Sequence, residues 1–240
     1  MRWLIRLSFV GAAYCGWQKQ INGVSVQEKV MDAVCAVFGG TERFSGCSRT
    51  DAGVHALDYC ASFSVDRSME PQRMISALNA HLPADIAVFS AVPVSEAFHA
   101  RYDVKQKTYH YRIRTALFRS PFDEGRVWHR PGAADLSALN AAAKPLVGTH
   151  DFTSFMAAGS KITDAVRTVY DASFFPEKDG VVFSVSADGF LYHMVRIMVG
   201  TLTANGTTPE KIAAVLEGKD RSLAGVTAPA CGLYLARVEY

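Results

Sequence analysis

The sequence lacks the common signatures of metal, nucleotide and serine-hydrolase chemistry. Its seven histidines form no HxxxH or HExxH pattern, and no GxGxxG or P-loop stretch is present. No GxSxG elbow surrounds a serine. The five cysteines form no CxxC pair, and their number is odd, which indicates reduced thiols in a cytoplasmic protein. These absences argue against a zinc site, a nucleotide cofactor and a disulfide framework.

The chain also has little net charge and no long apolar run. A formal charge of +2 over 240 residues does not by itself indicate a nucleic-acid binder. Arg6 interrupts the N-terminal apolar run and leaves only Leu7 to Ala13, which is too short for a membrane span. We therefore expect no membrane segment and no secretion signal. A content of 49% hydrophobic and 20% charged residues is typical of a soluble globular protein.

The pattern of elements predicts an α+β fold built from two similar halves. In the first half, Ser25 and Glu28 form a capping box before a helix, and Pro71 starts a second helix. Strands are expected over 2–10, 42–47, 58–65 and 85–94. The second half repeats the order, with strands over 108–115, 167–176, 180–187 and 232–240. Its helices are expected after Asp135, over 190–202 and after Pro209. We predict two ferredoxin-like (βαββαβ) halves, 1–102 and 103–240, whose sheets are continuous.

The stretch SRTDAGVHA, residues 48–56, can be interpreted in two ways. Asp51 can bond nearby backbone N–H groups in a tight turn, as aspartates in such turns often do. Alternatively, the loop presents Asp51 as a reactive carboxylate. Arg49 lies two residues earlier, so both side chains can point to one side of an extended segment, and Gly53 permits a reversal behind them. We interpret His55 as a residue that holds the shape of the loop.

Arg196 is unusual because apolar residues surround it in the expected helix. One interpretation is an arginine at the margin of the helix whose charged end reaches water. The other pairs it with an acid from the first half, for which Asp51 is the natural candidate, and such a pair would keep the carboxylate ionised. If that pair is buried, removing Asp51 alone should cost about 3–5 kcal/mol.

Residues 101–115 combine basic and aromatic side chains. Five cations accompany a single acid, Asp103; they are Arg101, Lys105, Lys107, Arg112 and Arg114. Strand alternation places Tyr109, Tyr111 and Ile113 on one face. Cations that meet phosphates, together with a ring that stacks on a base, suit a looped or single-stranded RNA. The alternative is an edge strand with a charged outer face and core tyrosines.

Several stretches, in one order over nearly the whole chain, resemble the tRNA pseudouridine synthase A family. They are YCGWQKQ at 14–20, SVQE at 25, SRTDAGVHA at 48, NAHLP at 79, FHAR at 98, KTYHYRI at 107, HDFTSF at 150, HMVRIMVGTL at 193 and APACGLYLARVEY at 228. The chain departs from the family at Ser48, where bacterial members usually have glycine, and at Cys231, where an acidic residue is common. The resemblance implies the pseudouridine synthase fold, with a mainly antiparallel sheet and helices packed on one face.

The resemblance also implies an activity and its site. Members isomerise uridine to pseudouridine at positions 38, 39 and 40 of the tRNA anticodon stem-loop, as homodimers and without a metal or other cofactor. The family's aspartate maps onto Asp51, which acts as a nucleophile at the ribose or as a base at its C2′. Tyr109 corresponds to the base-stacking tyrosine, and Leu233 to a leucine that lines the site. Arg49 looks like the arginine that keeps the target nucleotide out of its stack, and Arg196 would pair with Asp51.

Two other functions fit parts of the sequence. A non-catalytic RNA-binding module of the same fold would keep the basic strand and Tyr109 without needing Asp51 and Arg196 together. A metal phosphohydrolase would use the dipeptide His150-Asp151, although this dipeptide is common in proteins.

Overall fold

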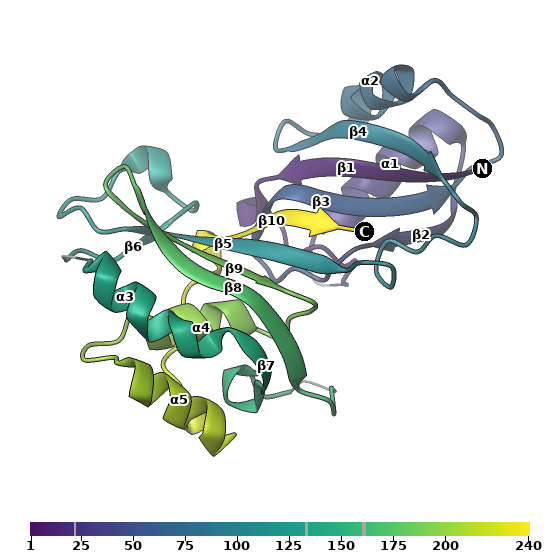
Figure 1. Cartoon of the computed structure of the whole chain (residues 1–240). Coiled ribbons are helices and arrows are strands. Elements are labelled where there is room, and N and C mark those ends of the chain that lie inside the picture. Colours follow the sequence, from purple (N-terminus) through teal and green to yellow (C-terminus); the bar gives the residue numbers. More distant parts are fainter. Residues whose placement is uncertain (22, 133, 160–161) are drawn as a thin grey trace. The chain divides into compact units, whose positions relative to one another are not determined.

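A computed structural model describes the chain from residue 1 to 240 except residues 22, 133 and 160–161 (Figure 1). Contacts divide the chain into two compact units. Unit 1 comprises Met1–Lys105 and Tyr234–Tyr240, and unit 2 comprises Gln106–Leu233. The described residues form a mixed fold of ten strands and five α-helices. The halves predicted from the sequence, 1–102 and 103–240, stay a prediction. The two units are defined by contacts between residues, and the last strand belongs to unit 1 together with the first part of the chain.

Unit 1 has the ferredoxin-like order β-α-β-β-α-β. Its elements are β1 (Arg2–Phe9), α1 (Val26–Phe38), β2 (Glu42–Gly46), β3 (His55–Ser64), α2 (Pro71–His81) and β4 (Ile86–Val94). β1 lies between β3 and β4, and β2 pairs with β3, all antiparallel. The final strand, β10 (Leu233–Glu239), runs parallel to β3 with Tyr234 opposite His55. The order of elements predicted for the first half of the chain is therefore confirmed.

The helices of unit 1 begin where the sequence signals predict. Ser25 is the N-cap of α1, and its hydroxyl accepts the N–H of Glu28 at 3.2 Å. Gly39 ends this helix with a left-handed φ of +83°. Glu70 caps α2, and Pro71 occupies its first turn. Apolar residues of both helices are buried: Val26, Val30, Ala33 and Val34 in α1, and Met74 and Leu78 in α2.

Unit 2 contributes mainly antiparallel strands and three helices. Its elements are β5 (Gln106–Arg114), β6 (Trp128–His129), α3 (Leu136–Ala143), β7 (Gly148–Asp151), β8 (Val166–Glu177), β9 (Gly180–Ala187), α4 (Met194–Leu202) and α5 (Pro209–Gly218). The strand order is β5-β9-β8-β7, and the short β6 pairs in parallel with β5. α3 packs on β8, and α4 packs on β5. Asp135 caps α3 as predicted, accepting the N–H groups of Ser137 and Ala138.

One predicted helix boundary in unit 2 is wrong. The apolar stretch 190–202 predicts a helix along its full length, but α4 begins only at Met194. His193 adopts a φ of +59°, which a right-handed helix does not allow, so the chain turns there before the helix starts. The turn is closed by a hydrogen bond from the N–H of Met194 to the carbonyl of Leu191, 3.1 Å long.

Candidate functional site

The loop that carries Asp51 is a tight turn just before β3. The N–H of Val54 donates to the carbonyl of Asp51 at 3.2 Å, and Gly53 has a φ of +79°. The reversal predicted from Gly53 is therefore confirmed. Asp51 is half-buried, whereas Arg49, two residues earlier, is exposed. The two side chains that the family resemblance selects thus lie on one short segment of unit 1.

Two glycines from an earlier segment, 11–17, bring its backbone against this loop. A Cβ atom on Gly16 would lie 2.4 Å from the carbonyl oxygen of Thr50, and one on Gly11 would lie 1.9 Å from that of Val54. Gly16 also has a φ of +103°, which favours glycine. The N–H of Trp17 donates to the Thr50 carbonyl at 3.2 Å. Only glycine allows this approach, so the segment 11–17 fixes the position of the Asp51 loop.

Aromatic side chains support the other end of the loop. The indole of Trp17 stacks on the ring of Tyr59 with centroids 3.9 Å apart. The Tyr59 hydroxyl, in turn, donates to the carbonyl of Ser48. A Cβ atom on Gly46 would lie 2.3 Å from that hydroxyl oxygen, so this position also leaves no room for a side chain. Ser48 therefore stands at an anchored point of the backbone.

His55 is buried at the first position of β3 and contacts the same segment. Its Nδ1 accepts the N–H of Gly11 at 3.0 Å, so this nitrogen carries no proton. Its ring stacks on Tyr234 of β10, with centroids 4.6 Å apart. These contacts support the interpretation that His55 holds the shape of the loop.

In unit 2, β5 divides its side chains as strand alternation predicts. Tyr109, Tyr111 and Ile113 are buried, and the residues between them are half-buried. The ring of Tyr109 is only 5% exposed and meets the edge of Phe190 at a centroid distance of 4.9 Å. The alternative prediction of core tyrosines is therefore confirmed. β5 pairs with β9 along most of its length, and with β6 only at Ile113 and Arg114.

The arginines on the other face of β5 pair with acids that lie outside residues 101–115. Arg112 donates through Nε to both carboxylate oxygens of Glu177 at 3.0 Å. Arg114 forms ion pairs of 3.1 Å with Asp123 and 3.2 Å with Asp179. The stretch 101–115 contains a single acid, but these two arginines bond to acids outside it. Their charges are largely balanced within unit 2.

Arg196 lies on α4 and is half-buried. Its Nε donates to the carbonyl of Ala228 at 2.8 Å, and the N–H of Ala228 donates back to the carbonyl of Arg196 at 3.1 Å. The segment 225–229 can follow α4 this closely because of Gly200, where a Cβ atom would lie 1.8 Å from the carbonyl oxygen of Val226. The arginine therefore joins the helix to this segment.

The same segment is held from the other side by Tyr111. Its buried hydroxyl donates to the carbonyl of Pro229 at 2.7 Å, and burial raises its pKa. Leu233, which follows shortly after, is 6% exposed. Cys231 donates its thiol to the carbonyl of Val127 at 3.4 Å. Burial raises the pKa of this thiol too, so the residue that departs from the family stays protonated.

The predicted site residues thus fall into two groups. Unit 1 carries Arg49 and Asp51 on one loop, and unit 2 carries Tyr109, Arg196 and Leu233. Because Asp51 and Arg196 belong to different units, their ion pair stays a prediction.

The residues of the phosphohydrolase alternative serve local structure. Asp151 Oδ1 accepts the N–H and the hydroxyl of Thr153, and Oδ2 forms a 3.0 Å ion pair with Lys219. These bonds hold the pKa of Asp151 below its usual value. His150 Nε2 bonds to the carbonyl of Val147 at 3.1 Å. Over the described ranges, no three His, Cys, Asp or Glu side chains are grouped as metal ligands would be.

The chain is similar to tRNA pseudouridine synthases along most of its length. A family model described as tRNA pseudouridine synthase matches residues 7–103 and 142–240. The chain is 45% identical over 241 residues to tRNA pseudouridine synthase A of Moorella thermoacetica, covering 98% of both chains. It is 41% identical over 239 residues to tRNA pseudouridine synthase A of Clostridium acetobutylicum, again over 98% of each chain. None of the helices in the described ranges has the length and apolar character needed to cross a membrane.

Proposed function

Because the chain belongs to the tRNA pseudouridine synthase family, we propose that it is an isomerase that converts uridine to pseudouridine in tRNA. We further propose that it acts at positions 38, 39 and 40 of the anticodon stem-loop. The observation that carries the proposal is the loop of unit 1, which presents Asp51 on a backbone fixed by Gly11, Gly16 and Gly53. A backbone held this tightly positions a catalytic carboxylate before the substrate arrives.

The reaction rearranges one nucleotide. The N1–C1′ bond breaks, the uracil turns and C5 bonds to C1′. The hydrogen of C5 leaves as a proton, and N1 takes up a proton. Asp51 acts either as a nucleophile at the ribose or as a base at its C2′. Reactant and product are isomers, so neither an oxidant nor a reductant is consumed.

The target nucleotide must leave its stack before Asp51 can reach the glycosidic bond, at a cost of a few kcal/mol. Arg49 is exposed on the same loop and suits the role of holding the extruded nucleotide. From unit 2, Tyr109 would stack on the uracil, and Leu233 would line the site. Arg196 would keep Asp51 ionised through an ion pair.

We propose that the enzyme works in the cytoplasm as a homodimer, with one tRNA bound across both subunits. Two copies double the basic surface that one RNA meets, which suits a chain whose formal charge is only +2. The binding constant for tRNA should then fall as the salt concentration rises. A plot of the logarithm of one against the logarithm of the other should have a slope of several units. A dissociation constant that does not respond to salt would contradict phosphate-dominated binding.

The proposal is tested by mapping pseudouridine in an unmodified tRNA transcript that carries uridine at 38, 39 and 40. Three matched transcripts carry cytidine at one of these positions each, and EDTA is present throughout. We expect pseudouridine at the remaining uridines and nowhere else in the tRNA. Pseudouridine found only outside the anticodon stem-loop would refute the proposed action at positions 38, 39 and 40. Activity that requires added metal would refute the proposed chemistry, which uses none.

A further inference from the structure

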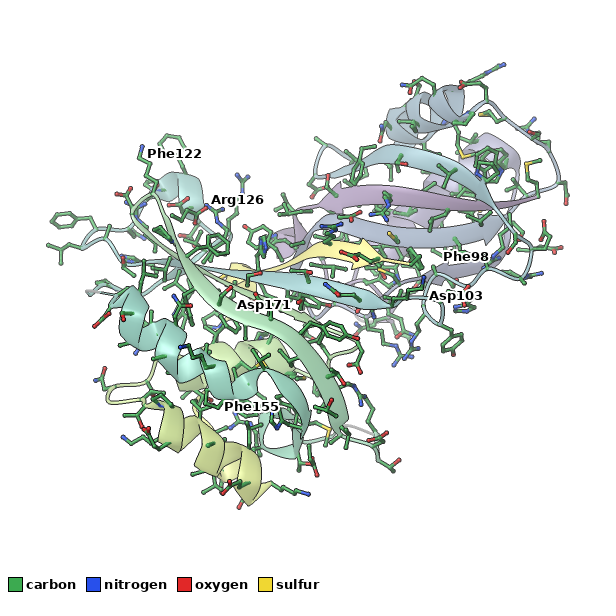
Figure 2. The ribbon with its side chains drawn as sticks, viewed as in Figure 1. Phe98, Asp103, Phe122, Arg126, Phe155 and Asp171 are labelled. Carbon is green, nitrogen blue, oxygen red and sulfur yellow. The ribbon has the colours of Figure 1, made fainter. Side chains whose placement is uncertain are left out.

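Residues 98–103 of unit 1, here called the aromatic turn, expose a tyrosine that the proposed chemistry does not use. The turn follows β4, and its two end residues, Phe98 and Asp103, are labelled in Figure 2. The side chain of Tyr102 is 74% exposed, and its ring stacks on His99 with centroids 4.3 Å apart. The guanidinium carbon of Arg101 lies 5.8 Å from the centroid of the same ring. An imidazole and a cation thus accompany one exposed ring.

Local hydrogen bonds fix the shape of the aromatic turn. Asp103 Oδ2 accepts the N–H of His99 at 2.9 Å, and the N–H of Asp103 donates to the carbonyl of His99 at 3.1 Å. The Nδ1 of His99 accepts the N–H groups of Arg101 at 3.1 Å and Tyr102 at 3.3 Å. The ring that stacks on Tyr102 is therefore itself held by the backbone of the turn. Tyr102 is presented in one orientation at little further cost in conformational entropy.

Side chains of unit 1 donate hydrogen bonds to backbone carbonyls of the aromatic turn. Arg2 is only 2% exposed, and its guanidinium donates to the carbonyl of Phe98 and, at 2.9 Å, to the hydroxyl of Ser62. The Tyr240 hydroxyl donates to the carbonyl of Ala100 at 2.8 Å. A buried arginine is costly unless it is fully bonded, so this support is substantial for a surface turn.

The charges around the turn favour an anionic partner. Arg101 and Lys105 are both exposed, and among the described residues neither forms an ion pair. The one carboxylate within the turn, that of Asp103, accepts the His99 N–H through Oδ2. An exposed ring with one cation against it, Arg101, and a second, Lys105, three residues along the chain is a combination suited to unstacked bases and their phosphates.

We propose that the aromatic turn is a second RNA contact of this protein, in which an unpaired tRNA base stacks on Tyr102 while Arg101 and Lys105 meet phosphates. This inference rests on the proposed function, because it takes tRNA as the ligand. The turn bonds to Ser62, whereas Asp51 precedes His55 at the other end of β3. Seven residues of strand span roughly 23 Å. The contact therefore serves affinity and not the chemical step.

The test measures the dissociation constant of a full-length unmodified tRNA transcript and the turnover at saturating tRNA, with the whole protein. Tyr102→Ala should raise the dissociation constant by about fivefold or more, the loss expected for one stacked base, and leave saturated turnover unchanged. Tyr102→Phe keeps the ring and should bind like wild type. Phe89→Ala removes a 50% exposed ring from β4 and serves as the matched control. Replacing both Arg101 and Lys105 by Gln should change the dependence of tRNA binding on salt. The slope of the logarithm of the dissociation constant against the logarithm of salt concentration should fall by about two.

Each outcome bears on the contact or on the activity separately. Equal tRNA affinity of wild type and Tyr102→Ala overturns the contact, even if wild type forms pseudouridine normally. Weaker binding by Tyr102→Ala, with no pseudouridine formed by wild type, supports the contact and refutes the proposed function. A change in oligomeric state by sedimentation, with tRNA affinity unchanged, would assign the turn to contact between copies of the chain and overturn the proposal.

Discussion

The Asp51 loop of unit 1 and the Arg196 segment of unit 2 are both positioned by close backbone approach, but in different ways. Gly11 and Gly16 bring one backbone against another, and the turn is closed by backbone hydrogen bonds. In unit 2, Gly200 allows a similar approach, but the side chain of Arg196 itself bonds the carbonyl of Ala228. The first region is thus held by glycines, backbone bonds and the side chains of Tyr59 and His55, whereas in the second the predicted site residue itself makes one of the bonds.

This difference predicts that Asp51 can be changed with little loss of stability. Asp51→Asn should reduce turnover by at least about 10³-fold, since the carboxylate carries the chemistry. Because Asp51 and Arg196 are both half-buried, the free energy of unfolding should fall by only about 1 kcal/mol. Single-turnover assays and denaturant unfolding measure the two effects. A loss of about 3–5 kcal/mol would instead reveal a buried pair with Arg196. Normal tRNA binding by the inactive variant would exclude the binding-module alternative.

Gly16→Ala should disturb the backbone of the same loop directly. A left-handed φ and a Cβ atom 2.4 Å from the Thr50 oxygen should together cost about 3 kcal/mol and lower turnover as the loop shifts. Gly39→Ala is the matched control, because Gly39 has a φ of +83° but no atom within 4 Å of the added Cβ. Thermal unfolding should give it a loss of only about 1 kcal/mol. Equal losses would mean that the close approach to Thr50 is unimportant.

Arg196→Met should affect turnover and folding together, unlike the change at Asp51. The carbonyl of Ala228 loses a charged donor, which should cost about 1.5–3 kcal/mol. The variant should also lose turnover, and Arg196→Lys should restore neither property fully because it lacks the Nε–H that Ala228 accepts. Urea unfolding and turnover at saturating tRNA measure both. Wild-type stability in Arg196→Met would contradict the role assigned to this side chain in joining α4 to segment 225–229.

The smallest effect is expected at Thr50, whose buried hydroxyl oxygen has no hydrogen-bond partner among the described residues. Thr50→Val removes this unsatisfied group and should raise the free energy of unfolding by up to about 1 kcal/mol. Activity separates two roles for the hydroxyl. Unchanged turnover would make it dispensable, whereas a stable variant with weakened turnover would mean that the hydroxyl meets the substrate. A destabilised variant would contradict its description as unsatisfied.

Local sequence signals predicted much of the fold. The capping box at Ser25, the proline at 71 and the aspartate at 135 each mark the start of a helix, because caps depend on residues only a few positions apart. The start of α4 was not predictable in this way. The apolar run continues through His193, and only the φ of that residue in the folded chain interrupts the helix.

The candidate site was less predictable, since its geometry depends on distant contacts. The window around Arg112 contains one acid, yet its partner is Glu177 from the far end of β8. Likewise, nothing near Arg196 in the sequence indicates a bond to the carbonyl of Ala228. The requirement for glycine at position 16 becomes apparent only in the fold, where the backbone of Thr50 lies against it. The motif made Asp51 the candidate, and the contacts of its loop give the reasons for its position.

The most direct test of the central claim is tritium release from unmodified tRNA labelled at uridine C5, with EDTA present throughout. Formation of the new C5–C1′ bond expels this hydrogen, so release reports the isomerisation itself. We expect release by wild type and none by Asp51→Ala at equal tRNA occupancy. Release at the wild-type rate by folded Asp51→Ala, or no release by wild type that binds tRNA, would contradict the account.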